Sequence, residues 1–467
     1  MTDRDLLANF WTDLGGAPGL LDRVQIGGRS AILPSIFDVT GFATATVAAA
    51  VLAVAELSAS RAGTPDEVPD VAAERLAASA SFRFDSLLVP HGWTLPPIWD
   101  PVAGDYPTAD GWIRLHTNYR RHLEAALSVL DVGADRAAVA AEVARWKAED
   151  LEVAVVAAGG CAAAMRSTEE WASHEAGRVT ADERPVIIGA PVPTSGGTGP
   201  GLLHAVGGPP LAGIRILDLT RVIAGPVATR FLAGYGADVL RIDPPGFDEV
   251  PALLPEATAG KRCAFLDLTS ADGRASFESL VAEAHVVVGG LRPGALAGLG
   301  LGPDALRAIN PAIINVTHDA YGWSGPWAGR RGFDSLVQMS TGIAHAGAVA
   351  AGVDRPTPLP AQALDHGVGH LLAAATCRAL TRLVADETTA DVRGSLVGAA
   401  NVLKAAPAPP GAFSPVTVAD AALEQGTTAW GSIERVPLAG RIDGIVPTWA
   451  IEAGPLGRHP AEFANVV

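Results

Sequence analysis

The residue best placed to do chemistry is an aspartate late in the chain. Asp365 lies between an apolar run, residues 358–364, and the glycine-spaced segment His366-Gly367-Val368-Gly369. A carboxylate is ionised at neutral pH without help and can act as a nucleophile. Glycines behind it leave backbone N–H groups free to bind an oxyanion. The competing interpretation is an N-cap for a helix that starts near residue 367. Residue type alone favours the N-cap, and both interpretations stay open.

A second set of candidates is cationic. Lys261 and Arg262 stand in a basic turn that leads into a strand, and Arg292 follows a buried strand, so that it lies at the carboxyl end of that strand. Arg330 and Arg331 form a further pair. Cationic side chains suit phosphate groups, and arginine adds bidentate pairing. The alternative is ordinary solvated surface charge.

Other familiar chemistries are poorly supported. His366 and the pair His318-Asp319 are the acid/base candidates. Adjacent residues at the start of a helix point in different directions, so we interpret His366 as a packing or capping residue. No HExxH motif, paired cysteines or carboxylate cluster indicates a metal site. The GxGxxG fingerprint and a nucleophile-elbow GxSxG are also missing, which argues against dinucleotide binding and against an α/β-hydrolase.

The elements that must position these residues are organised around residues 211–246. Residues 214–219 predict a strand, 227–235 a helix with small and apolar residues on one face, and 239–242 a second strand. This β-α-β unit should have a right-handed crossover and parallel strands. Further strands are expected near 264–268, 285–289 and 313–317, and helices at 366–383 and 391–404. The loop after the first strand lies at the carboxyl edge of the sheet, where open α/β sheets bind ligands.

At this stretch the sequence resembles a known family. LDLTRVIAGP followed by GADVLRIDPPG resembles the family III CoA-transferases, also called the CaiB/BaiF family, which include formyl-CoA transferase, carnitine CoA-transferase and α-methylacyl-CoA racemases. The pieces follow the family's order with about its spacing, over residues 211–402 and more loosely over 105–171. Further matching segments are Gly260-Lys261-Arg262, Leu291-Arg292-Pro293-Gly294, Leu299-Gly300-Leu301-Gly302, Asn310-Pro311, Gly322-Trp323-Ser324-Gly325-Pro326, Gly332-Phe333-Asp334 and Ala363-Leu364-Asp365.

The resemblance implies a function for several of these residues. Asp365 takes the place of the family's nucleophile, which reacts through an aspartyl anhydride and an aspartyl-CoA thioester. Coenzyme A or its acyl thioester is expected as a substrate, with no permanently bound cofactor and no metal. The positions expected to line the CoA site are Ile223, Ala224, Lys261, Arg262, Leu266, Gly290, Leu291, Arg292, Arg331, Gly332, Phe333 and Asp334.

Three departures from the family pattern weaken particular contacts. The family's E-N-F-R-P-G motif has Gly289, Gly290 and Leu291 at its first three positions here, so a polar contact with CoA is expected to be missing. Pro244 stands where formyl-CoA transferase has an arginine. Phe333 stands where the racemases carry a histidine that works as the second acid/base group.

The N-terminal part resembles the family's smaller domain, which normally follows the nucleotide-fold domain. YPTADGW and the helix start near Thr168-Glu169-Glu170-Trp171 carry this likeness. LPSIFD before a helix at 39–60 also echoes LPAQALD before the helix at 366–383, so the chain is interpreted as a rearranged or partly duplicated member, with chance likeness of two alanine-rich helices as the alternative. We therefore predict a smaller domain at 1–185, a Pro/Gly linker at 186–210, a Rossmann-like catalytic domain at 211–404 and a loop-rich tail at 405–467.

Composition limits the partners. The chain of 467 residues has a net charge of -16, which argues against nucleic acid. Cys161, Cys263 and Cys377 stand far apart and fit a reducing cytoplasm, and the acidic N-terminus does not resemble a secretion signal. The most apolar run, residues 43–57, is too short to span a bilayer and is expected to be a buried helix.

The sequence thus predicts an α/β fold, a Rossmann-like parallel-sheet domain with a smaller α+β domain, in an interlocked homodimer. The expected activity is transfer of CoA from an acyl-CoA to a carboxylic acid. The alternatives are a 2-methylacyl-CoA racemase or isomerase and a catalytically weak acyl-CoA-binding homologue. A nicotinamide oxidoreductase is disfavoured because the glycine fingerprint is missing.

Overall fold

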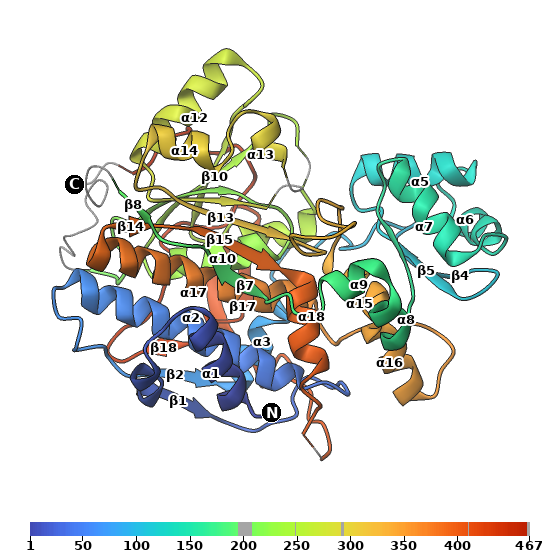
Figure 1. Cartoon of the computed structure of the whole chain (residues 1–467), viewed down its shortest axis with the longest axis horizontal. Helices are drawn as coiled ribbons and strands as arrows, with labels where there is room; N and C mark the ends of the chain where they lie inside the picture. The colour runs from blue at the N-terminus through green and yellow to red at the C-terminus, as the bar shows by residue number, and fades with distance from the viewer. Residues whose placement is uncertain (195–207, 248, 291–293, 410, 465–467) are drawn as a thin grey trace.

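The computed structural model describes residues 1–194, 208–247, 249–290, 294–409 and 411–464. Leu291 and Arg292, two of the expected CoA contacts, lie outside these residues, as does most of the glycine-rich part of the predicted linker. Figure 1 shows a large body built around one sheet and a smaller lobe that projects to one side.

A seven-stranded sheet forms the centre of the large body. All neighbouring strands are parallel except the last pair, β15 and β7, which is antiparallel. β7 belongs to the predicted linker, so the first residues of that stretch form an edge strand. In spatial order the strands are β11 (Lys261–Phe265), β10 (Asp238–Asp243), β9 (Arg215–Leu219), β12 (Val286–Gly289), β13 (Ile314–Asp319), β15 (Asp391–Ser395) and β7 (Val186–Ile188).

Both faces of the sheet are covered, which explains why its strands are apolar at consecutive positions. Ile216 of β9 faces a core shared with α10 (Ala224–Gly234) and α17 (Ala363–Asp386). The next residue, Leu217, faces the opposite core, which includes Phe277 of α12 (Ala271–Glu283). This alternation is the period of two expected for a strand, and the α/β prediction is confirmed.

The N-terminal segment packs directly onto this body. α1 (Asp3–Asp13) and α2 (Val39–Arg61) share the core of α17, and almost every residue of α2 is buried. α2 is long and apolar enough to cross a membrane by length and composition, but 89% of its most apolar window is buried inside the molecule. α2 is therefore a core helix here, in agreement with the sequence analysis.

The smaller lobe comes from the middle of the N-terminal part (Figure 1). Three antiparallel strands pair in the order β4 (Gly104–Pro107), β5 (Trp112–Leu115), β6 (Ala162–Ala164). They share a separate core with α5 (Arg120–Leu130), α6 (Arg136–Val143) and α7 (Ala148–Ala157). Tyr119 joins the lobe to the large body, because its hydroxyl donates to Glu249 at 2.7 Å.

The C-terminal tail returns to the N-terminal segment. β18 (Arg441–Ile442) pairs with β2 (Val71–Glu74), which also pairs with β1 (Val24–Gly27). β17 (Gly431–Arg435) pairs with β16 (Glu424–Thr428) and with β3 (Val89–Pro90). The tail is loop-rich between these short strands, and the predicted domain limits stay a prediction.

Two local predictions need correction. The predicted helix at 391–404 is the strand β15 followed by α18 (Leu396–Lys404), because Ser395 caps the helix by accepting from the Gly398 N–H. The strand expected at 264–268 begins three residues earlier, at Lys261. That shift decides the position of the Lys261 side chain.

Candidate active site

Asp365 stands in the first turn of α17. The helix begins at Ala363, after Gln362 as its N-cap residue, so Asp365 is the third helical residue and the N-cap interpretation is wrong. Within the described residues the Asp365 carboxylate makes no hydrogen bond and no ion pair. It lines two cavities. A carboxylate without a partner at the junction of two cavities is available to react.

A second carboxylate fixes the start of α17. Asp334, the first residue of α15 (Asp334–Ser340), is fully buried and accepts the Asp365 backbone N–H at 3.0 Å. The Gln338 side-chain amide also donates to Asp334. Burial, together with the negative charge of Asp334, raises the pKa of Asp365 well above its usual range. Burial also raises the pKa of Asp334 to about 6. The two carboxyls thus disfavour each other's ionisation.

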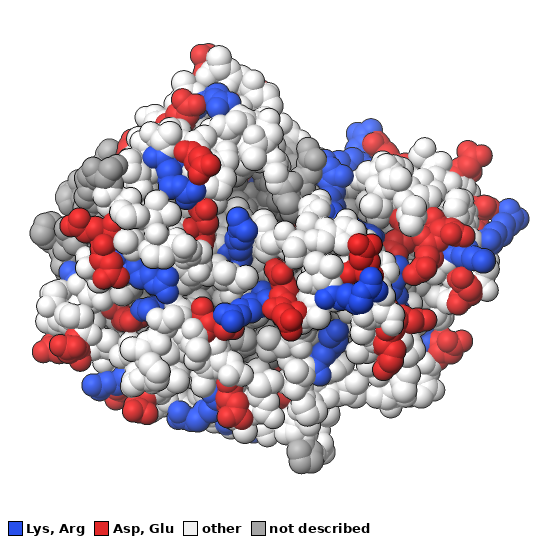
Figure 2. Space-filling view, viewed as in Figure 1, with Lys and Arg blue, Asp and Glu red and all other residues white. Residues whose placement is uncertain are grey.

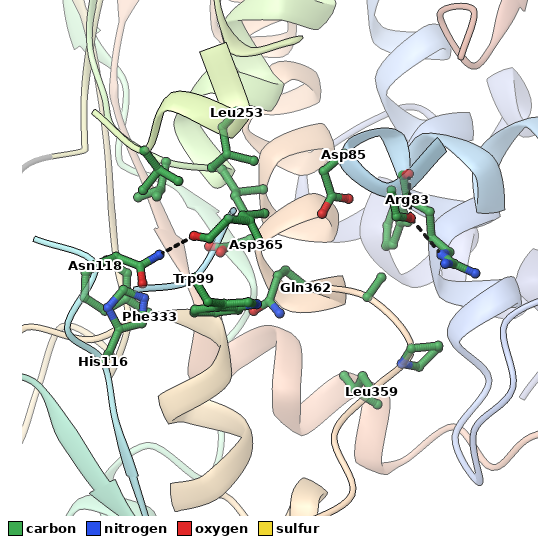
Figure 3. Close-up of a pocket in the computed structure, with 18 residues that line it drawn as sticks. Arg83, Asp85, Trp99, His116, Asn118, Leu253, Phe333, Leu359, Gln362 and Asp365 are labelled. Atoms are coloured by element: carbon green, nitrogen blue, oxygen red, sulfur yellow. Dashed lines mark hydrogen bonds between the residues drawn. The ribbon is translucent and has the colours of Figure 1, made fainter. Parts of the chain in front are cut away.

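The first cavity has a volume of about 210 Å³ and lies between the N-terminal segment, the lobe and the α17 turn. Figure 3 shows Asp365 near Leu253, Asn118 and Trp99, with Arg83 at the opposite end of the view. We call it the acid-side cavity. It is lined by Phe82, Arg83, Asp85, Ser86, Ile98, Trp99, His116, Asn118, Val222, Ile223, Val250, Leu253, Phe333, Leu359, Pro360, Ala361, Gln362 and Asp365.

The second cavity is larger, about 610 Å³, and basic; we call it the CoA-side cavity because several positions at which the family resemblance implies CoA contacts line it. Five arginines line it, against two carboxylates, Asp319 and Asp365. This local excess of positive charge stands out in a chain of net charge -16. On the face drawn in Figure 2, acidic and basic side chains of the described residues intermingle without a continuous basic stripe. The arginines are Arg120, Arg121, Arg221, Arg330 and Arg331.

The side chains of these arginines differ in how firmly other residues hold them. Arg330 donates to Glu152 at 2.7 Å and lies over the Trp327 ring, so its position is fixed. Arg221 pairs with Asp243 at 3.0 Å. Arg121 is exposed and has no ion pair within the described part of the chain. Arg121 is therefore the cation with the most freedom to turn toward a phosphate.

Several expected CoA contacts do meet at these cavities. Ala224, Gly290, Arg331 and Gly332 line the CoA-side cavity, and Phe333 lines both. Ile223, the residue before α10, lines the acid-side cavity instead. Pro244, which stands where formyl-CoA transferase has an arginine, also lines the CoA-side cavity.

The prediction for Lys261 is wrong. Because β11 begins at Lys261, the side chain enters the sheet interior and is 1% exposed. Its ammonium donates to Asp218 at 2.9 Å and to the Pro226 carbonyl at 3.2 Å. Burial lowers the pKa of Lys261, against the opposing effect of Asp218. Lys261 ties β11 to β9 and α10 and cannot reach a phosphate in either cavity.

Three other predicted contacts are absent from the walls of both cavities. Arg262 forms an ion pair with Asp238. Leu266 packs against the core under α12. Asp334 lies behind Asp365 and contacts its backbone. None of the three is placed to touch CoA in the cavities described.

The sequence analysis missed the contribution of the lobe. Tyr119, Arg120, Arg121 and His122 line the CoA-side cavity, and Trp99 and His116 line the acid-side cavity. The signal available was the dibasic pair Arg120-Arg121, a few residues after the YPTADGW segment. The segment was treated only as domain scaffolding.

Comparisons with known proteins find a match in the central part of the chain. Residues 211–410 match the model of CoA-transferase family III. This stretch contains the central strands β9 to β13 and β15, the two aspartates Asp334 and Asp365, and most of the residues that line the two cavities. The resemblance to the family III CoA-transferases is thereby confirmed over these residues.

The similar proteins match only part of the chain. A probable fatty acyl-CoA transferase of Mycobacterium tuberculosis is 36% identical over 37% of this chain and 46% of its own length. A succinate–glutarate CoA-transferase of Agrobacterium fabrum is 36% identical over 29% of this chain and 38% of its own length. The match to a crystal structure of a Mycobacterium tuberculosis protein covers 42% of this chain and 57% of the chain in that structure, at 33% identity and with a TM-score of 0.40. The chain thus spans less than half the length of these curated relatives.

Proposed function

We propose that the protein moves CoA from an acyl-CoA to a carboxylic acid, with Asp365 as the nucleophile. The observation that carries the proposal is the position of the Asp365 carboxylate: it makes no hydrogen bond in the described structure and stands where the basic CoA-side cavity meets the acid-side cavity. Arginines suit the phosphates of CoA. The acid-side cavity is the place for the acyl group and then for the free acid.

The proposed steps are those that the family resemblance implies, and the placement of Asp365 supports them. A carboxylate oxygen of Asp365 attacks the thioester carbonyl carbon, the C–S bond breaks, and CoA leaves as the thiolate with a mixed anhydride on Asp365. The thiolate then attacks the aspartyl carbonyl, which releases the donor acid and leaves an aspartyl-CoA thioester. The acceptor carboxylate reverses the sequence. Covalent catalysis of this kind divides one difficult transfer into easier steps.

A trapping experiment tests the nucleophile. Wild-type protein and Asp365→Ala are incubated with a panel of acyl-CoAs and labelled acids, with hydroxylamine present in a parallel set. We expect the wild type to transfer CoA and to carry a hydroxamate at Asp365, and the variant to fold and to lose transfer. Full transfer by Asp365→Ala would refute the mechanism, and loss only in Asp38→Ala would assign the chemistry to the other repeat.

The racemase alternative is tested by proton exchange. Racemisation needs one group to remove the α-proton and another to return it from the opposite face. Phe333, at the family position of the second group, has no exchangeable proton. We expect no incorporation of deuterium into a 2-methylacyl-CoA while CoA transfer proceeds. Incorporation as fast as transfer would favour a racemase, and CoA binding with neither reaction would favour a binding homologue.

The remaining expectations belong to the same proposal. Acyl-CoA and a carboxylic acid are the partners, and neither nucleic acid nor a membrane is needed. The protein is proposed to act in the cytoplasm and as a homodimer, with coenzyme A as a substrate rather than a resident cofactor. Light scattering of the purified protein measures the oligomeric state directly.

A further inference from the structure

We propose that His116 donates a hydrogen bond to the substrate carbonyl oxygen in the acid-side cavity, and so stabilises the charge that develops when Asp365 attacks. This inference rests on the proposed function and adds a catalytic residue to it. His116 lies outside residues 211–410, in the N-terminal part of the chain.

The first observation is an imidazole without polar partners. His116 is 4% exposed and lines the acid-side cavity together with Asp365. Its Nδ1 is buried and has no hydrogen-bond partner among the residues that the structure describes. An atom buried in this way cannot meet a ligand, and an unpaired N–H is costly to bury, so the ring N–H belongs on Nε2. Nε2 is therefore the nitrogen that is left to donate into the cavity.

The second observation is that the ring is held rigidly. The His116 and Phe333 rings stack face to face, with centroids 3.6 Å apart and planes 4° apart. Trp99 meets His116 edge-on at 5.7 Å, and the Arg114 guanidinium in turn lies over the Trp99 ring. Figure 3 shows His116 beside Phe333 in the group of residues around Asp365. A donor fixed by packing loses little freedom on binding and is preorganised for a transition state.

The third observation concerns the protonation state. Burial, with the nearby charge of Arg114, lowers the pKa of His116 to about 3. The imidazole is therefore neutral at every ordinary working pH, and a neutral imidazole always carries one N–H. It can donate a hydrogen bond without acting as an acid.

The proposed hydrogen bond from His116 fits the movement of electron pairs during the reaction. As the Asp365 oxygen bonds to the carbonyl carbon, the carbonyl oxygen takes up the electron pair of the C=O π bond and becomes an oxyanion. When the C–S bond breaks, that pair returns and the thiolate leaves with the electrons of the broken bond. The His116 proton stays on its nitrogen throughout. Phe333 thus replaces a histidine at one position and supports another histidine from the lobe.

The test variant removes the N–H donor but keeps an aromatic ring at position 116. In His116→Phe the aromatic stack with Phe333 is retained and the N–H is lost. We expect kcat for CoA transfer to fall by about 10²–10³, the range seen when one oxyanion donor is removed. The Kd for CoA should stay within about twofold, because His116 does not line the CoA-side cavity. The pH profile should keep its shape, since the neutral ring does not titrate there.

Two further variants separate chemistry from packing. His116→Gln restores an N–H donor and should recover at least about tenfold of the lost kcat. His174→Phe is the matched control, because His174 also stacks on an aromatic ring, that of Trp171, but lines neither cavity. It should leave kcat unchanged.

The outcomes are distinct. Transfer by His116→Phe at half the wild-type kcat or more would overturn the inference. The inference would also be overturned if His116→Phe and His116→Gln lost kcat equally and both showed a lower Tm, because the loss would then come from destabilised packing. If the wild type transfers CoA to no acid, the proposed function fails, and the nitrogen-15 NMR signal of the His116 ring still decides its role. That signal moves when propionate is added if His116 binds a carboxylate, and an unchanged signal at saturating propionate would refute it.

Discussion

At the scale of single residues, the site depends on two carboxyls that share the start of one helix. Asp334 accepts the backbone N–H of Asp365 and leaves the Asp365 side chain unbound. The cost is that each carboxyl disfavours the ionised form of the other. Because attack requires ionised Asp365, the rate of transfer is expected to increase as pH rises through its raised pKa.

The direction of the pKa shift in Asp334→Asn can therefore be predicted. The amide still accepts the Asp365 N–H through its oxygen but carries no negative charge, so the pKa of Asp365 should fall. The rise of kcat/KM with pH should therefore move to lower pH, which a pH–rate profile measures. Asp304→Asn, at an exposed aspartate, is the control and should leave the profile unchanged. A shift to higher pH would contradict the electrostatic account.

Residue-level reasoning from the sequence was most specific where the signal was local. Asp365 was proposed as the nucleophile because its neighbours in sequence carry a family pattern, and this role stays a prediction. Lys261 was misassigned because a strand boundary was wrong by three residues, which turned a surface cation into a buried ion pair. His116 was not proposed from the sequence because its role depends on Phe333, more than two hundred positions away, and on cavity walls from widely separated parts of the chain.

At the scale of elements, the pairing of α2 with α17 dominates the core. Both helices follow a Leu-Pro segment, and each has an aspartate at or near its start. The aspartates have different surroundings. Asp38 is the N-cap of α2 and accepts the Gly41 N–H at 2.8 Å, whereas Asp365 stands within its helix and caps nothing. The sequence predicted both helices, but not that they pack against each other.

Asp38→Ala should therefore affect stability rather than catalysis. Loss of an N-cap typically costs about 0.5–2 kcal/mol in the free energy of unfolding. Denaturant unfolding should show that loss, with kcat for CoA transfer close to that of the wild type. A large fall in kcat with unchanged stability would mean that Asp38 takes part in the reaction.

The contact between the two helices depends on a glycine. A Cβ atom on Gly367 would lie 2.1 Å from Cε1 of Phe42 in α2, so Gly367→Ala has to push the helices apart. Overpacking of this kind costs about 1–3 kcal/mol. Gly133→Ala is the matched control, since a Cβ there meets no atom within 4 Å. Urea unfolding should separate the two variants, and equal stability would show that the interface adapts.

At the scale of the whole molecule, the segment matched to the family is not self-contained. α1 and α2 bury one side of α17, and the lobe supplies residues to both cavities. A fragment that starts at Pro209 would expose the apolar face of α17. We expect it to be insoluble or inactive, because large exposed apolar patches drive association. A soluble fragment that transfers CoA would show that the first 190 residues form an independent module.

The interleaving of the chain ends has a consequence for the order of events during biosynthesis. β2 and β3 are made early, yet their partners β18 and β17 belong to the last part of the chain. While the ribosome is still translating the centre of the protein, these edges have no complement and remain open to foreign strands. We expect native closure to wait until β17 and β18 have been synthesised, so that holdase chaperones bind the nascent N-terminal segment more strongly than the folded protein.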